Sequence, residues 1–362
     1  MRPRTTPAHR TAALVAAVAL AATACAGGDD ATEEGATEGS AGAAGGTVTL
    51  VTHDSFNVSE EVVAAFEEET GLTVRLLPSG DAGSMLNQVI LTADDPEGDV
   101  VFGVDNTLLS RALDAEVFQP YASPELASVP DELVVDERVT PIDTGDVCLN
   151  YDVAAFEGRE VPETLADLTD PAYAGELVVE NPATSSPGLA FLLATVETFG
   201  EDGWVGFWED LVANDVLVVD GWEEAYYGEF SGAGGGEGDR PLVVSYASSP
   251  PAEVFFADPQ PETAPTGVIV DSCFRQVEYA GLLANAANPE GGRLLIDFLL
   301  SETFQADVPL NMFVFPVREG VALPEVFVEH AVVAEDPIEM DPARIEANRE
   351  DWIDTWTATV LR

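Results

Sequence analysis

Two segments of the chain combine aromatic residues with small hydroxyls, the residue types that line ligand-binding clefts. Trp222 follows an apolar run that ends at Asp220-Gly221, and Tyr246 follows a second apolar run at 242–244. In α/β proteins, ligands bind beyond the carboxyl ends of strands. The pattern therefore predicts the rim of a binding cleft, with two core strands and ordinary turns as the alternative.

Residues for catalysis are sparse by comparison. Only two histidines follow the N-terminal segment, His53 and His330, and they lack metal-ligand spacing. His53-Asp54-Ser55 contains the residue types of a hydrolase triad, but triads are assembled from distant positions, and no Gly-x-Ser-x-Gly elbow is present. We therefore expect a ligand-binding protein rather than an enzyme, with no metal and no cofactor.

The composition is strongly acidic. The 362 residues include 66 Asp and Glu against 14 Arg and no Lys, which gives a formal charge of −52, and 46% of the residues are hydrophobic. Such a charge argues against nucleic acid and anionic membrane surfaces as partners. Concentrated salt weakens self-repulsion, because the Debye length falls to about 3 Å at 1 M. The composition thus indicates a halophilic, salt-adapted protein with enough apolar material for two domains.

The N-terminus has the features of a secretory signal. Arg2, Arg4 and Arg10 precede a small, apolar run at 11–24, which is shorter than the ~20 residues of a membrane span. Cys25 follows, and the arrangement resembles a bacterial lipoprotein signal over residues 1–25. Residues 26–46 are Gly, Ala, Thr, Ser and acids, typical of a flexible tether. We expect an extracytoplasmic protein anchored to the membrane through Cys25; a signal without lipidation is the alternative.

Two further cysteines, Cys148 and Cys273, lie in apolar, strand-like segments. Outside the cytoplasm, an even pair of cysteines predicts a disulfide. Two free, buried thiols are the alternative.

Strand and helix patterns alternate along the body of the chain. A strand pattern at 47–52 precedes a helix pattern that Ser59 begins, and strand patterns follow at 72–77 and 99–103. Further on, we expect a strand at 311–317 and a terminal helix at 344–360, with Trp352 and Trp356 in the core. The alternation predicts an α/β fold with a mostly parallel sheet and helices on both faces.

Several segments together resemble the solute-binding proteins of ABC importers, in the group that serves ferric iron, polyamines and thiamine. The match is closest to the thiamine-binding members and covers the chain from about Thr47. The segments that carry it are FEEETGLTV (66–74), DLTDPAYAG (167–175), NPATSSPGL (181–189), HDSF (53–56), DAGSMLN (81–87), DVVFGVDNTLL (99–109), GWEEAY (221–226), VSYASSP (244–250) and WIDTW (352–356).

The resemblance implies a type II periplasmic-binding-protein fold, with mixed sheets flanked by helices and two α/β lobes around a hinged cleft. We expect the first lobe to span 47–147 and 271–308, and the second to span 148–270 and 309–362. The resemblance also implies a monomer that takes thiamine or thiamine phosphates as ligand and delivers them to an ABC permease and its ATPase subunits.

The resemblance also implies the residues of the site. Aromatic faces stabilise a cation by roughly 0.5–2 kcal/mol each, and a carboxylate supplies a counter-charge. Hydroxyls at a helix start suit a phosphate. The candidate ligand-binding residues are the rings of His53, Trp222, Tyr246 and Phe313, the carboxylates of Asp81 and, as second choice, Asp105, and the hydroxyls of Ser84, Ser185 and Ser186.

The chain departs from its relatives at three positions. His53 stands where they commonly have Tyr, Ala252 replaces a Tyr that holds phosphate, and Phe313 replaces an indole. These changes weaken the expectation for phosphate esters more than for thiamine. Two alternatives stay open: a ferric-ion-binding protein, because of the pair Tyr226-Tyr227, and a surface-anchored hydrolase.

Overall fold

The structure of the protein is a computed structural model that describes residues 46–234 and 238–361. The predicted signal at 1–25 with Cys25, and nearly all of the tether, lie outside the described residues. Within these ranges, no helix has both the length and the apolar character that a membrane span requires.

The described strands form one sheet in the order β2-β1-β3-β8-β4-β7-β5-β6, with β9 paired to β4. Their bounds are β1 (Thr47–Thr52), β2 (Thr73–Pro78), β3 (Val100–Asp105), β4 (Thr140–Asp152), β5 (Leu177–Glu180), β6 (Leu217–Val219), β7 (Leu242–Tyr246), β8 (Thr266–Leu282) and β9 (Phe315–Pro316). Strands β2, β1 and β3 are parallel, and so are β7, β5 and β6; we call these groups the first and second halves of the sheet.

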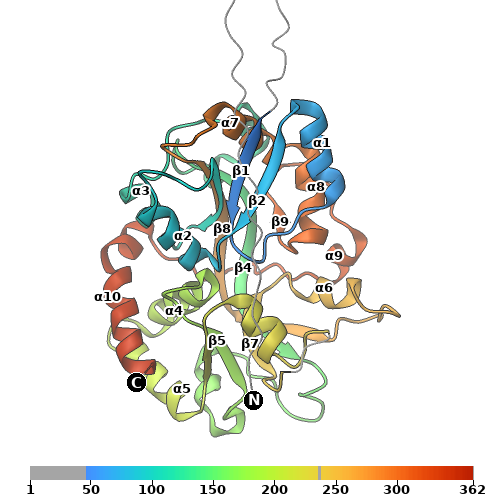
Figure 1. The fold of residues 1–362 in the computed structure, drawn as a ribbon. Coiled ribbons are helices and arrows are strands. Elements are labelled where there is room, and N and C mark those ends of the chain that lie inside the picture. The colour runs from blue at the N-terminus through green and yellow to red at the C-terminus, as the bar shows by residue number, and fades with distance from the viewer. Residues whose placement is uncertain (1–45, 235–237, 362) are drawn as a thin grey trace, which may run out of the picture. The chain divides into compact units, whose positions relative to one another are not determined.

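The two longest strands join these halves. β4 and β8 have 13 and 17 residues and run antiparallel to each other. β8 pairs with β3 of the first half, and β4 pairs with β7 of the second, so both strands extend from one half to the other (Figure 1). The sheet is therefore mixed rather than mostly parallel, and the α/β fold class with helices flanking the sheet is confirmed.

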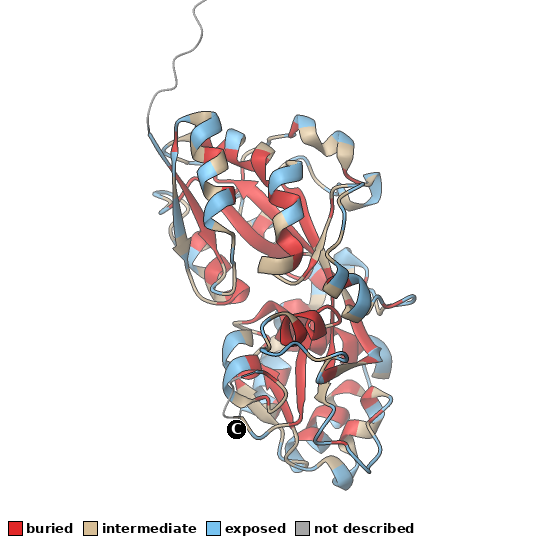
Figure 2. Ribbon diagram, turned by 90° about the vertical axis from the view of Figure 1, so that its right-hand side faces the viewer, coloured by how far each residue is buried: buried red, intermediate tan, exposed pale blue. Residues whose placement is uncertain are grey.

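Helices flank the strands, most of which are buried (Figure 2); the edge strand β2 is largely exposed. The bounds of the helices are α1 (Glu60–Thr70), α2 (Ala82–Leu91), α3 (Leu109–Asp114), α4 (Ser186–Phe199), α5 (Trp204–Ala213), α6 (Pro250–Phe255), α7 (Pro289–Leu299), α8 (Glu302–Asn311), α9 (Glu325–His330) and α10 (Pro342–Val360). Short 3-10 turns are η1 (Pro124–Ser128), η2 (Asp131–Leu133), η3 (Leu165–Thr169) and η4 (Pro171–Tyr173); η5 (Glu224–Glu229) is a π-helix.

Helix α1 shows how local sequence sets an element. The Ser59 hydroxyl accepts the Val62 amide proton at the start of the helix, and Gly71 ends it with φ 72°, a left-handed conformation that favours glycine. Phe66 faces inward and packs edge-on against Phe298 of α7, with ring centroids 5.3 Å apart. The helix therefore covers the first half of the sheet together with α7.

Helices α4, α5 and α10 share the core of the second half. Trp208 of α5 meets Trp356 of α10 edge-on at 5.5 Å between ring centroids, and its indole donates to the Thr195 hydroxyl at 3.0 Å. Trp352 and Trp356 are both buried, which confirms the prediction that they belong to the core.

The expected strand at 311–317 is wrong for most of its length. Helix α8 continues to Asn311, and only Phe315–Pro316 are paired as β9. Between them Phe313 has φ 54°, and this left-handed residue turns the chain toward β4 instead of extending it.

Candidate functional site

A cavity of about 340 Å³ is lined by residues from both halves of the sheet and by Glu278 of β8. Its volume is within the range of about 300–1,000 Å³ that is usual for small-molecule sites. Aromatic rings dominate its lining: His53, Phe56, Trp222, Tyr226, Tyr227, Tyr246, Phe256 and Phe313. Among the described lining residues none is Arg, while Asp54, Glu223 and Glu278 are acidic. The cavity therefore suits a flat ligand with positive charge.

Trp222 follows β6, and Tyr246 is the last residue of β7, so both lie at strand ends as the sequence predicted. The Trp222 ring stacks on Tyr226 at 5.0 Å between centroids with an 18° interplanar angle, and Tyr246 lies 6.2 Å away at 66°. The indole N–H donates to the Ser245 hydroxyl at 2.9 Å, which fixes the orientation of the ring. The two aromatic residues thus form one wall with defined geometry.

His53 lies on the opposite side, just after β1. Its Nδ1 is 3.0 Å from the Ser55 hydroxyl, and its Nε2 is 3.6 Å from Glu278 Oε1, too far for a good hydrogen bond. Burial lowers the pKa of the His53 imidazole to about 4. The ring is therefore neutral at neutral pH, and it presents an aromatic face without a positive charge.

Asp81 occupies the junction between α2 and α4. Its carboxylate accepts the amide protons of Ala82, Ser186 at 3.2 Å and Trp222 at 3.0 Å. Burial raises the pKa of the Asp81 carboxyl to about 6, although the amides of Trp222 and Ser186 act in the opposite direction. Asp81 and Ser186 line a second, smaller cavity together with His53, Trp222, Tyr246 and Glu278. Asp81 thus ties Trp222 to the start of α4 beside the main cavity.

The predicted serines gather at the same junction. Ser185 begins α4, and its hydroxyl accepts the Gly188 amide proton. The Ser84 amide donates to the Thr184 carbonyl at 3.0 Å, and a Cβ on the neighbouring Gly83 would be 2.7 Å from Thr184 backbone atoms. The glycine therefore permits α2 to approach the loop before α4 closely. Neither Ser84 nor Ser185 lines either cavity.

Asp105 lines neither cavity. Its side chain is fully buried and accepts the amide protons of Thr107 and Leu108, the Thr107 hydroxyl proton and the Gln276 amide. These contacts are those of a residue that holds the turn after β3.

Phe313 lies in the lining, 5.6 Å from Phe256 and 6.2 Å from Phe255 between centroids. Ala252 also lines the cavity, so the position without a tyrosine is at the site.

Cys148 and Cys273 form a disulfide between β4 and β8, in a cluster with Ala247 and Ala334 that is separate from the cavity lining.

Glu278 is a lining residue that sequence reasoning missed. It lies on β8 opposite Asp105 of β3 and Asp143 of β4. Burial, and after it the charge of Asp143, raises the pKa of Glu278 well above its ordinary value. Burial also raises the pKa of Asp143, to about 7. The sequence does not single out this pair, because β4 also carries Asp146 and β8 also carries Asp271.

The two adjacent tyrosines bear on the ferric-ion alternative. The Tyr226 hydroxyl donates to Glu253 at 3.0 Å, while Tyr227 is half exposed and lines the cavity. Burial and the charge of Glu253 raise the pKa of Tyr226 well above its ordinary value, which disfavours the tyrosinate that would bind ferric ion. In the described part of the chain, no group of three or more His, Cys, Asp or Glu could hold a metal ion.

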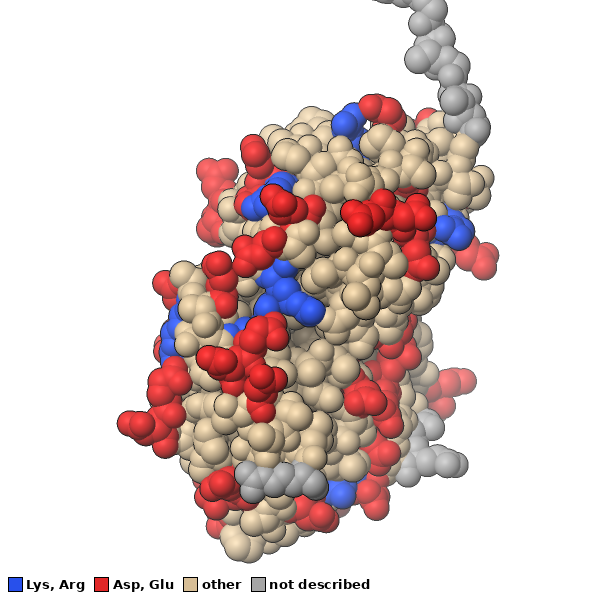
Figure 3. All heavy atoms as spheres, turned by 60° about the vertical axis from the view of Figure 1, so that its left-hand side comes forward, with Lys and Arg blue, Asp and Glu red and all other residues tan. Residues whose placement is uncertain are grey.

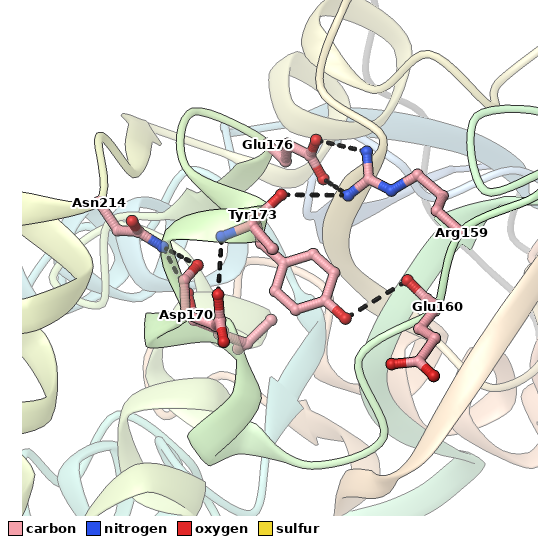
Figure 4. Close-up of polar contacts among 8 residues, drawn as sticks. Arg159, Glu160, Asp170, Tyr173, Glu176 and Asn214 are labelled. Carbon is pink, nitrogen blue, oxygen red and sulfur yellow. Dashed lines mark hydrogen bonds and ion pairs between the residues drawn. The ribbon is translucent and has the colours of Figure 1, made fainter.

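Not every segment that carries the resemblance contributes to the cavity. In 167–175, Asp170 accepts the Ala172 amide proton at 2.8 Å and the Tyr173 hydroxyl donates to the Glu160 carbonyl (Figure 4). Arg159 pairs with Glu176 beside them at 2.6 Å. These contacts hold a loop of the second half in place.

Comparisons with known proteins assign the chain to a family. The family described as "Bacterial extracellular solute-binding protein" matches residues 95–335. The thiamine-binding periplasmic proteins of Salmonella typhimurium and Escherichia coli are each 29% identical over 320 residues, which cover 87% of this chain and 94% of each relative. Iron uptake protein A1 of Synechocystis is 26% identical over 292 residues, covering 76% of this chain and 77% of the relative.

A solved structure described as a periplasmic thiamin binding protein has a TM-score of 0.78 and 27% identity to this chain. The alignment covers 87% of this chain and 96% of the other. A ferric-ion-binding protein of Pasteurella haemolytica has a TM-score of 0.68 at 16% identity, which shows a shared fold.

Proposed function

Because the chain belongs to the family of bacterial extracellular solute-binding proteins, we propose that it captures thiamine outside the cytoplasm and delivers it to an ABC importer. The observation that carries the proposal is the cavity of about 340 Å³, which is lined by aromatic rings and acids and by no Arg among its described residues. The relatives named for thiamine support the same ligand.

The chemistry of thiamine fits this lining. The molecule joins a planar aminopyrimidine to a permanently cationic thiazolium ring. Trp222, Tyr246 and Phe313 line the cavity with aromatic rings, and a ring that turns its face to a cation contributes roughly 0.5–2 kcal/mol. The neutral His53 adds a ring without electrostatic repulsion. Acidic side chains are scattered over the face in Figure 3 and outnumber the basic ones there, and an excess of negative charge favours the approach of a cation.

The structure favours thiamine over its phosphate esters as ligand. The Ser186 amide at the start of α4 already donates to the Asp81 carboxylate, so a phosphate there would meet a negative charge. Glu223 and Glu278 add further acids to the cavity, and Ala252 offers no hydroxyl. We therefore place thiamine first and its monophosphate and diphosphate below it.

Isothermal titration calorimetry in molar salt tests the proposal. Thiamine, its monophosphate and diphosphate, spermidine and ferric citrate are titrated separately into the purified protein. We expect the strongest binding for thiamine. Heat from ferric citrate alone, with a visible tyrosinate-to-iron band, would instead establish the ferric-ion alternative, and the absence of heat with every thiamine species would reject the main proposal.

We also propose that Cys25 carries a lipid that anchors the protein outside the cell. The proposal rests on the signal-like sequence at 1–25 and on the tether that follows it. Mass spectrometry of the N-terminal peptide from membranes tests it. A diacylglyceryl mass on Cys25 is expected, and release of the wild-type protein into the medium with an unmodified cysteine would contradict it.

A further inference from the structure

We propose that Glu278 makes the cavity selective for a cation, and that the bound cation replaces a proton shared by Glu278 and Asp143. This inference rests on the proposed function, because it assigns the residue that meets the charged ring of the ligand. It differs from the sequence prediction, which gave that role to Asp81 or Asp105.

The first argument is position. Glu278 is 6% exposed, and it lines both the main cavity and the smaller one beside Asp81. Asp81 lines only the smaller cavity, and three backbone amide protons already occupy its carboxylate. Glu278 is therefore better placed than Asp81 to approach a ligand that rests against Trp222 and Tyr246.

The second argument is the absence of any cationic partner for Glu278 in the described part of the chain. The titratable groups that surround it are His53 after β1, Asp81 before α2, Asp105 on β3, Asp143 on β4 and Tyr246 on β7. Burial keeps His53 neutral at neutral pH, and the others are acids or a phenol. A buried carboxylate without a cation is costly, and such a group usually takes up a proton instead.

The third argument is the pairing with Asp143. Asp143 lies opposite Glu278 in the register of β4 and β8 and is 1% exposed. Neither oxygen of its carboxyl has a hydrogen-bond partner among the described residues, and its charge acts on Glu278. Two neighbouring carboxyls in a buried place cannot both ionise readily, so they share a proton. Asp143 does not line the cavity and acts as a positioning residue for Glu278.

A bound cation changes this balance. Its positive charge beside Glu278 favours the ionised pair over the protonated one, and the attraction is strong because water is excluded. The O–H bond of the pair breaks, its electrons stay on the carboxylate, and the proton passes to a buffer base. A neutral ligand leaves the proton in place, so the cavity distinguishes a cation from a neutral molecule of the same shape.

The test compares thiamine with its deaza analogue, in which a neutral thiophene replaces the thiazolium ring. Calorimetry is run on the wild type, on Glu278→Gln and on Glu180→Gln, in phosphate and in Tris at neutral pH. Glu180 is the matched control, because it is equally buried and without hydrogen-bond partners for its oxygens but lies outside both cavities. The difference in heat between the two buffers counts the protons released.

We expect the wild type and Glu180→Gln to prefer thiamine by at least about tenfold and to release protons on binding it. Glu278→Gln should reduce this preference to below about threefold and abolish the release. Asp143→Asn should lower the number of released protons while the preference for thiamine persists, a result that a purely structural role would not produce. Unchanged preference and release in Glu278→Gln would overturn the inference while thiamine binding stands.

A further arm separates the inference from the proposed function. The N-methylthiazolium ion, the cationic ring alone, is titrated into the same variants. If the wild type binds this ion through Glu278 but does not bind thiamine, the inference stands and the proposed function fails. If the wild type binds neither, both are rejected.

Discussion

Replacing Trp222 by alanine would remove the one indole among the described residues of the cavity lining. The ring is held by four contacts: it stacks on Tyr226, meets Tyr227 at 5.6 Å and Tyr246 at 6.2 Å, and donates to the Ser245 hydroxyl at 2.9 Å. Its backbone N–H, which donates to Asp81, is kept in the variant. The substitution therefore removes the aromatic wall and leaves the backbone connection to the junction.

The expected loss follows from these contacts. One aromatic face contributes about 0.5–2 kcal/mol to a bound cation. Tyr246 and Ser245 also lose order without the indole, which adds to the loss of binding free energy. The hydrogen bond between the indole and Ser245 is worth about 1 kcal/mol. We therefore expect Trp222→Ala to weaken thiamine binding by at least about tenfold, or 1.4 kcal/mol, and by less than about a thousandfold. Trp222→Phe should lose less, because it keeps a ring.

Calorimetry measures the affinities, and thermal unfolding is recorded for every variant. Trp352→Phe is the control. Trp352 belongs to α10, is buried in the core and is not in the cavity lining. The control should lower the unfolding temperature and leave affinity within about twofold. Wild-type affinity in a folded Trp222→Ala protein would refute the assignment of Trp222 to the site.

Three further predictions concern the acids and the surface. Asp81→Asn should weaken thiamine binding by at least about tenfold, because asparagine cannot accept the three amide protons that hold Trp222 and α4 together; calorimetry that gives wild-type affinity would contradict this role. The unfolding free energy should fall as the pH rises from 4 to 7. The reason is that the pKa values of Asp81 and Asp143 are raised to about 6 and about 7, so these carboxyls bind more protons in the folded than in the unfolded state. The fall is at most about 1.4 kcal/mol per pH unit for each group. Urea titrations measure it, and Asp143→Asn should flatten the slope; an equal slope in that variant would show that other groups set it. Finally, the protein has a formal charge of −52, and salt screens the repulsion between its charges. The unfolding temperature, measured by calorimetric melting, should therefore be higher in molar salt than in low salt. Equal stability in both would count against salt adaptation.

The alternation of strands and helices was visible in the sequence because each element carries its own period and caps. Ser59 begins α1 where the sequence indicated. Trp222 and Tyr246 follow strand patterns directly, so their place at a strand end could be predicted. These are local signals, and they are sufficient for the fold class and for one wall of the cavity.

The acid pair could not be predicted in the same way. Asp143 and Glu278 are brought together by the register of β4 and β8, which depends on how segments more than a hundred residues apart pair. Asp105 shows the converse problem: its sequence context suggested a ligand contact, but the side chain is occupied by Thr107, Leu108 and Gln276. Whether an acid faces a cavity or holds a turn is decided by tertiary contacts.

The position of the acid pair on β4 and β8 has a consequence for the order of events during binding. These two strands join the two halves of the sheet, so in a hinged protein they are the part that moves least. The acids would hold their place before and after closure, whereas His53 and Trp222 come from the flanking strands and would arrive from either side. Charge would therefore select the solute at first encounter, and the rings would enclose it afterwards, which separates the choice of ligand from its retention.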